Sequence, residues 1–249
     1  MNQPPVSRRQ RLHEATAEEI KAVARGLMAR EGTSSLNLRA VAREMGMTAS
    51  ALYRYFPSRD AILTALITDA FDAVGEAVEK ATIEAPMDGT CTRILAGVHA
   101  FRRWALEHPQ EYGLIYGTPV PGYEAPEDDT LEAAMRTNVV LIGELIRALQ
   151  NGIITPPPDE LMPPAVAAAM ACIAEDEHKA DLGLPPAVWA LAMQSWTLLL
   201  GAINAEVFGH LPRPLRDAAG SFFDFTIRRM LVAMGVEPQA VDTAVSPEF

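Results

Sequence analysis

Apolar residues recur with a helical period along most of this 249-residue chain. The first clear stripe has spacings of three and four residues and consists of Ile20, Val23, Ala24, Leu27 and Met28. Such spacing places the side chains on one face of an α-helix. No segment alternates apolar and polar residues for long enough to propose a strand, so the pattern predicts an all-α fold.

Glycine and proline divide the chain into the predicted helices. We expect helices at about 13–31, 38–45, 48–56, 59–84, 90–107, 109–117, 127–151, 160–178, 186–208 and 214–234. The chain after Pro238 is expected to be loose.

The most informative segment runs from Asn37 to Leu63 and contains two short helices and the start of a long one. The first short helix carries an apolar stripe that includes Leu38 and Val41. Glycine at position 46 is the usual helix stop, and Thr48 can cap the next helix by accepting from its free N–H groups. A short turn between short helices predicts a helix-turn-helix motif.

The second short helix, residues 48–56, has one apolar and one polar face. At about 100° per residue, Leu52 and Phe56 lie on the inner face, whereas Ser50 and Arg54 point the opposite way. This polar side is a candidate surface for reading a DNA groove. The alternative is a helical corner in an unrelated bundle.

Two tyrosines flank this polar side, Tyr53 on one edge and Tyr55 on the other. Arginine pairs with guanine or with phosphate, whereas tyrosine hydroxyls and capped helix ends mostly hold the DNA backbone, so Arg54 is the expected base reader. A cation at Arg59, in the first turn of the next helix after the expected cap Ser58, opposes the helix dipole unless an anion docks there, and Arg39 repeats this placement. The predicted DNA-binding residues are Asn37, Arg39, Thr48, Ala49, Ser50, Tyr53, Arg54, Tyr55 and Arg59.

At these residues the chain resembles the TetR/AcrR family of one-component bacterial transcriptional regulators. In that family a helix ending in glycine leads to a capped second helix, a leucine-tyrosine-x-histidine-phenylalanine run and a basic residue. The matching residues here are Met45–Thr48, Leu52–Phe56 and Arg59. Asn37 replaces the cap threonine, Tyr55 the frequent histidine and Arg59 the frequent lysine, and each keeps the required chemistry.

Charge is divided unevenly along the chain, which has a formal net charge of −11. Residues 1–60 hold 10 Lys and Arg against 6 Asp and Glu, a net of +4, which leaves −15 for the rest. This asymmetry predicts DNA binding that is confined to one surface and depends on salt. Arg8, Arg9 and Arg11 form a basic lead-in, either an arm that contacts DNA or a solvated, disordered terminus.

The stretch 101–126, together with WTLLLG at 196–201, resembles the C-terminal domain of one TetR branch, named for a tryptophan-histidine-glycine signature. Trp196 and Gly201 fit this signature, but Leu200 stands where the histidine is expected. The role of that histidine is therefore not carried over to this chain.

The resemblance implies an effector pocket among the central helices and a homodimer formed as a four-helix bundle by the helices at 186–208 and 214–234. Aromatic and adaptable apolar side chains supply candidate lining, although each is alternatively plain core. The candidates are Phe101, Trp104, Tyr112, Tyr116, Trp189, Met193 and Trp196. Such lining favours a small apolar or amphipathic effector.

The sequence lacks the motifs of common enzymes and metal sites. HExxH, GxSxG, GxGxxG and Walker patterns do not occur, and Cys91 and Cys172 match no zinc or redox spacing. The acidic run at 175–178 does not have metal-binding spacing along a helix. We therefore expect no catalysis, no metal and no cofactor.

One segment, residues 187–205, has nineteen residues without a charge and is long enough to span a membrane. Polar residues dilute it and its flanks are acidic rather than basic, so we expect a helix buried by its own domain and by a partner subunit. The N-terminus has no apolar run after its basic residues, so no secretory signal is expected. Two unpaired cysteines suit a reducing cytoplasm.

Together these patterns predict a DNA-binding domain at 1–60, an effector-binding and dimerisation domain at 61–238 and a loose tail at 239–249. The favoured function is a dimeric, ligand-responsive transcription factor on palindromic double-stranded DNA, usually a repressor in this family. The alternative is an acidic helical protein-interaction module with a vestigial DNA-binding corner.

Overall fold

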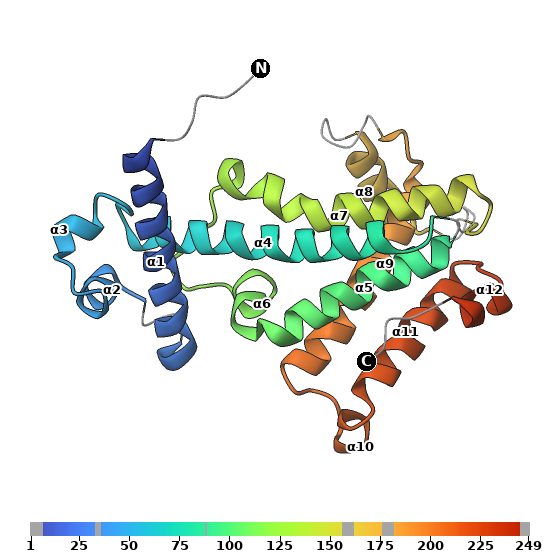
Figure 1. Cartoon of the computed structure of the whole chain (residues 1–249). Helices are drawn as coiled ribbons and strands as arrows, with labels where there is room; N and C mark the ends of the chain where they lie inside the picture. Colours follow the sequence, from blue (N-terminus) through green and yellow to red (C-terminus); the bar gives the residue numbers. More distant parts are fainter. Residues whose placement is uncertain (1–6, 33–35, 88, 156–161, 176–181, 245–249) are drawn as a thin grey trace. The chain divides into compact units, whose positions relative to one another are not determined.

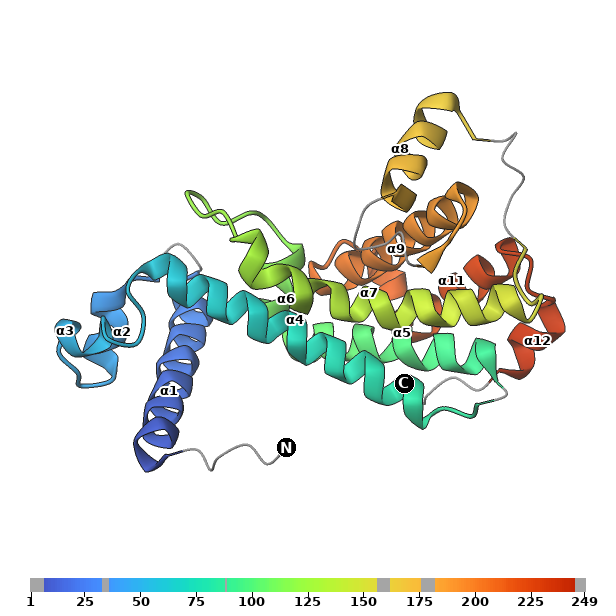
Figure 2. The same ribbon diagram turned by 90° about the horizontal axis from the view of Figure 1, so that it is seen from above.

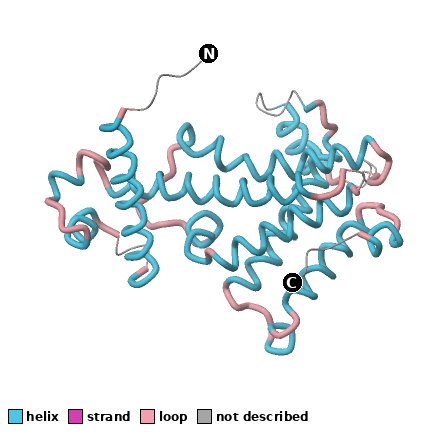
Figure 3. The backbone as a smooth tube through the Cα atoms, in the orientation of Figure 1, coloured by secondary structure: helices cyan, strands magenta, loops and turns pink. Residues whose placement is uncertain are grey.

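The computed structural model describes residues 7–32, 36–87, 89–155, 162–175 and 182–244, and every regular element in these ranges is a helix (Figures 1 and 3). The predicted all-α fold is thereby confirmed for the described residues. The helices are α1 (Arg8–Glu31), α2 (Leu38–Glu44), α3 (Ala49–Leu52), α4 (Arg59–Glu84), α5 (Thr90–Glu107), α6 (Pro109–Tyr116), α7 (Glu127–Gln150), α8 (Pro164–Glu175), α9 (Pro186–Val207), α10 (Arg213–Arg216), α11 (Ala219–Ala233) and α12 (Pro238–Thr243).

These helices form two compact units. The first contains the residues up to Ala73 together with His108–Arg136, and the second contains Val74–Glu107 and the residues from Thr137 on. Helices α4 and α7 therefore contribute to both units. The predicted domain boundary at residue 60 falls at the start of α4, inside the first unit, because the first turns of α4 supply part of that unit's core.

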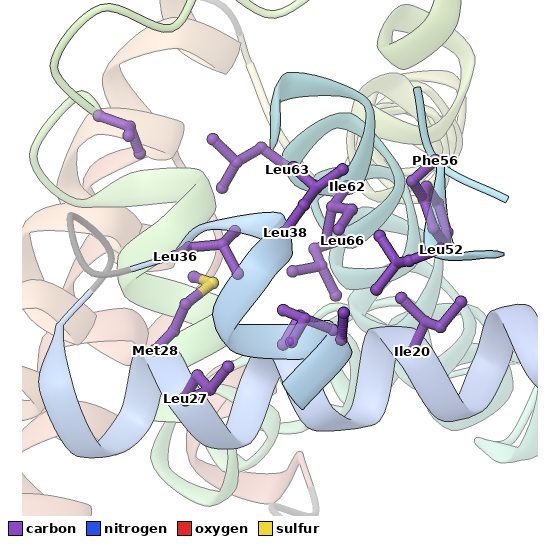
Figure 4. Packing of buried hydrophobic residues seen from close by; sticks show 14 residues of the cluster. Ile20, Leu27, Met28, Leu36, Leu38, Leu52, Phe56, Ile62, Leu63 and Leu66 are labelled. Atoms are coloured by element: carbon purple, nitrogen blue, oxygen red, sulfur yellow. The ribbon is translucent and has the colours of Figure 1, made fainter. Parts of the chain in front are cut away.

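The core of the first unit takes its side chains from α1, α2, α3, α4, the segments next to them and Val120 after α6 (Figure 4). Its labelled members are Ile20, Leu27, Met28, Leu36, Leu38, Leu52, Phe56, Ile62, Leu63 and Leu66. A fully buried leucine or isoleucine stabilises the fold by roughly 1.5–3 kcal/mol. Helices as short as α2 and α3 are marginal alone, so this shared core holds them in place.

The second unit has a buried ion pair between its helices. Arg93 of α5 donates through Nε and Nη2 to the carboxylate of Glu144 on α7, at 3.0 and 2.8 Å, and both side chains are only 5 % exposed. The hydrogen bond to Glu144 raises the pKa of Arg93. A bidentate pair of this kind fixes the orientation of α5 against α7.

Helix α9 is the apolar centre of the second unit and packs against α5, α8 and α11. Its neighbour α8 lies beside it in both views (Figures 1 and 2) and has no buried residue. Within the described residues, α9 alone is long and apolar enough to cross a membrane, and 39 % of that window is buried. Core helices of water-soluble proteins also meet this length and composition test.

Two predicted helices in the first unit have different bounds. Helix α1 begins at Arg8 rather than near residue 13, because the Ser7 hydroxyl caps it by accepting from the Gln10 N–H at 3.2 Å. Helix α3 ends at Leu52 rather than at residue 56, and the chain then tightens into a turn in which the Tyr55 N–H donates to the carbonyl of Leu52.

Two predictions near the C-terminus were wrong. The helix expected at 214–234 is divided into α10 and α11, because the chain leaves helical geometry at Ala218, where φ is −118° and ψ is 20°. The tail expected to be loose after Pro238 contains α12, in which Val241 is buried. Arg228 of α11 holds this segment by donating to the carbonyl oxygens of Val241 and Ala244.

Candidate nucleic-acid interface

The turn between α2 and α3 depends on Gly46. Its φ of 66° lies in the left-handed region that favours glycine. The N–H of Met47 reaches back to the carbonyl of Ala42 at 2.9 Å, which closes the end of α2. The predicted helix stop is confirmed, and with it the short connection that a helix-turn-helix needs.

Side-chain oxygens cap the N-termini of α2, α3 and α4. Asn37 Oδ1 accepts from the Ala40 N–H at 2.9 Å, Thr48 Oγ1 from the Ala51 N–H at 3.3 Å, and Ser58 Oγ from the Ala61 N–H at 3.0 Å. The predicted caps at Thr48 and Ser58 are confirmed. Asn37 replaces the family threonine with an equivalent oxygen.

The turn that contains α3 has the two faces that its sequence predicts. Leu52 is fully buried and Phe56 is 9 % exposed. Ser50 and Arg54 are exposed, and Tyr53 is 50 % exposed. Arginine and phenol groups are therefore exposed on the side away from the core, together with the Ser50 hydroxyl, whose Oγ lies 3.1 Å from Thr48 Oγ1.

Tyr55 is less exposed than Tyr53, the tyrosine on the other flank of this turn. Its side chain is only half-buried, and the ring stacks on His13 of α1 with centroids 4.5 Å apart and planes 16° apart. It also packs against the core of the first unit. The phenol is thus held against α1, a contact that the helical wheel did not predict.

Arg59 also has a contact that the sequence did not predict. Its Nε donates to the carbonyl oxygen of Leu36 at 3.1 Å, and its side chain is 26 % exposed. This bond ties the start of α4 to the segment before α2, which gives the cation a structural role even without an anion. Arg39, by contrast, is exposed.

The basic lead-in does not form an extended or disordered arm. Arg8, Arg9 and Arg11 all lie in the first turn of α1 and are exposed. Their backbone is therefore part of a helix of the first unit.

The candidate pocket residues are divided between the two units. In the second, Phe101 stacks on Trp196 with centroids 5.8 Å apart, and Trp104 and Trp189 are buried. Met193 is 43 % exposed, so it lies on the outside of α9 and not in an interior lining as predicted.

The two tyrosine candidates, Tyr112 and Tyr116, belong to the first unit. Tyr112 is fully buried, and the Tyr116 ring meets Phe71 edge-on at 5.8 Å. Burial raises the pKa of both phenols above their ordinary value. These contacts give both rings a packing role.

His99 is a buried polar residue in the second unit. It lies on α5, and its Nε2 is 3.0 Å from Oδ1 of Asp224 on α11. Burial lowers its pKa, and the charges of Arg102 and Arg228 add to this, whereas Asp224 opposes it. The group is therefore a neutral donor that links two helices of the second unit.

The described part of the chain contains no group of three or more His, Cys, Asp or Glu residues that could hold a metal ion. Of the acidic run at 175–178, all but Glu175 lies outside the described residues.

Sequence reasoning missed His13, yet a signal for it exists. His13 stands seven residues before Ile20, so it extends the apolar stripe of α1 by two turns. The bond from Arg59 to Leu36 had no such signal, because backbone carbonyls are the same at every position.

Comparison with known proteins gives matches along nearly the whole chain. A family model described as "Bacterial regulatory proteins, tetR family" matches residues 20–66, and one described as "Tetracyclin repressor-like, C-terminal domain" matches residues 94–230. HTH-type transcriptional regulators of Mycobacterium bovis (Mb1846) and Mycobacterium tuberculosis (Rv1816) are each 32 % identical over 237 residues, which cover 93 % of this chain and 97 % of theirs.

Solved structures agree with these sequence matches. The crystal structure of the regulatory protein SCO4313 is 31 % identical, covers 91 % of this chain and 100 % of its own, and superposes with a TM-score of 0.73. RolR, crystallised with resorcinol, has the same fold at 18 % identity and a TM-score of 0.54, with 96 % of this chain and 98 % of RolR covered.

Proposed function

Since this chain belongs to the TetR family of transcriptional regulators, we propose that it is a homodimeric repressor that leaves a palindromic operator when a small apolar or amphipathic effector binds. The observation that carries this proposal is the turn after Thr48, which exposes polar side chains on one side and packs its other side into the core of the first unit. Family membership leaves the interaction-module alternative without support. A regulator of this kind works in the cytoplasm, where operator DNA lies.

On the operator, we assign base reading to Arg54 and backbone contacts to its neighbours. The Arg54 guanidinium is exposed and can pair with O6 and N7 of guanine in the major groove. Tyr53, Ser50 and the capped start of α3 at Thr48 and Ala49 supply phosphate contacts, since hydroxyl and N–H groups fix register without reading sequence.

The remaining predicted residues support this surface from its edges. Arg39 is exposed at the start of α2, where it can meet a phosphate. Asn37 sets the direction of α2 through its cap, and Arg59 anchors the start of α4 on Leu36. Tyr55 keeps the turn packed against α1.

Dimerisation is supported by exposed apolar side chains on α9, on α11 and just after α9. Leu198 is 37 % exposed, Phe208 43 %, Phe222 36 % and Phe225 58 %. Helices α9 and α11 pack against each other, and large exposed apolar groups on neighbouring helices are typical of subunit interfaces. Two copies joined through α9 and the α10–α11 segment would present their reading turns about one DNA turn apart, roughly 35 Å.

Effector binding is supported by the aromatic pair of Phe101 and Trp196 in the second unit and by the fold shared with RolR, which was crystallised with a ligand. Helix α4 contributes residues to both units. We propose that an effector shifts α4 and thereby changes the spacing of the two reading turns.

The test starts from a pool of random duplexes and the full-length chain. A bound fraction enriched in one palindrome identifies the operator. On that duplex, the double variant Tyr53→Phe with Arg54→Ala should lose roughly 1–3 kcal/mol of binding in a gel shift. Arg103→Ala, an exposed cation on α5, should bind like the original chain. A pool without enrichment, or a double variant of unchanged affinity, would overturn the proposal.

A further inference from the structure

A cation-lined groove lies between the first turns of α1 and the turn after α3. It has a volume of about 930 Å³. Its lining residues include Arg8, Arg9, His13, Arg54 and Tyr55. Three arginines and a histidine are among them and no carboxylate is, so the groove offers positive charge and hydrogen-bond donors to an anion.

We propose that this groove binds the sugar-phosphate backbone of DNA, with Arg8 and Arg9 each neutralising a phosphate beside the bases that Arg54 reads. The inference rests on the proposed function, because Arg54 belongs to both surfaces. Arg8 and Arg9 come from α1 and Arg54 from the turn after α3, so the groove joins the base reader to two cations from a different helix.

Within this groove His13 is a positioning residue for Tyr55. The two rings stack at 4.5 Å, nearly parallel, and both line the groove. Stacking restricts the rotation of the phenol ring. A ring held in this way can donate to a phosphate with little loss of side-chain freedom on binding.

The chain contains a matched control for the two groove arginines. Arg11 lies in the same first turn of α1 and is exposed, but it does not line the groove. All three side chains oppose the positive end of the α1 dipole, so replacing any of them with alanine should not weaken the helix.

The experiment measures binding by fluorescence anisotropy on a labelled duplex of scrambled sequence and on the selected operator, from 0.05 to about 0.3 M salt. Arg8→Ala and Arg9→Ala should each make the slope of log K against log salt less steep by about 0.9. With binding at 1 M salt unchanged, that slope corresponds to roughly eightfold weaker binding at 0.1 M salt. Both duplexes should lose affinity equally, because backbone contacts are independent of sequence.

Arg11→Ala should leave the slope within error of the original chain, and circular dichroism checks that each variant keeps its helices. His13→Ala should weaken binding to both duplexes, whereas His13→Phe, which keeps the stacked ring, should restore it. Equal losses for Arg11→Ala and the groove variants, or no loss from Arg8→Ala and Arg9→Ala, would overturn the inference. Its failure is distinguishable from that of the proposed function, which depends on operator enrichment and on the Tyr53 and Arg54 variant.

Discussion

Gly97 allows α5 to approach α4 closely in the second unit. A Cβ atom at this position would lie 2.8 Å from Thr82 Oγ1 and 3.3 Å from Leu141 Cδ2. Thr82 is only 2 % exposed, and its hydroxyl has no hydrogen-bond partner among the described residues. Any side chain at Gly97 would press on a group that lies in a packed interface.

Gly97→Ala should therefore lower stability by about 1 kcal/mol or more, because overpacking outweighs the gain in helix propensity. Thermal unfolding followed by circular dichroism measures the change. Gly143→Ala is the control, since its Cβ would meet nothing within 4 Å and should stabilise α7 by roughly 0.5–1 kcal/mol. Thr82→Ala should partly rescue Gly97→Ala. Equal stability of the two glycine variants would contradict this account.

At the residue scale, the sequence predicted contacts between near neighbours and missed contacts between distant ones. The caps at Thr48 and Ser58 and the left-handed Gly46 follow from residues two to four positions away. The roles of Tyr55 and Arg59 depend on His13 and Leu36, which only the folded chain brings near. Long-range partners are not encoded in a helical period.

At the scale of elements, most helix bounds followed from proline and glycine, because these residues act locally. Helices α4, α5 and α6 have nearly the predicted bounds. The break between α10 and α11 and the ordered α12 were both missed. For the break, the apolar period continues from α10 into α11 and so gives no sign of it. For α12, Arg228 and Val241 meet only when the C-terminal segment folds back.

The link between α5 and α11 makes stability depend on pH through His99. Burial holds its pKa in the folded protein below the value of about 6.5 that the unfolded chain gives to histidine. As the pH falls through about 6.5, the unfolded chain takes up a proton before the folded protein does, so stability is lost on acidification. Asp224 reduces this loss, and Arg102 and Arg228 increase it.

His99→Gln keeps a donor for Asp224 and removes the titration. Its melting temperature should therefore fall less than that of the original chain between pH 7.5 and pH 5.5. His108→Gln removes an exposed histidine and should follow the original chain. If the His99 variant loses as much stability on acidification as the original chain does, the lowered pKa of His99 is not the cause of that loss.

For the whole molecule, the division of charge limits where DNA can bind. The first 60 residues carry +4 and the remainder −15. An acidic body repels DNA, so contacts should be restricted to the basic surface of each subunit. On the proposed palindromic operator, two such surfaces require a dimer, so the proposed interface on α9 and α11 should also determine DNA affinity.

Phe225 gives the sharpest test of that dimer, because it is the most exposed large apolar side chain on α11, at 58 %. Phe225→Glu places two like charges near the two-fold axis of an interface formed by α11, so the mass measured by light scattering should fall from about twice the chain mass to the chain mass. Val139→Glu, at a residue of α7 that is 62 % exposed, should leave the mass unchanged. The monomer should also bind the operator far more weakly, since one reading turn then acts without the other. A Phe225→Glu protein that remains a dimer and binds normally would place the subunit interface elsewhere.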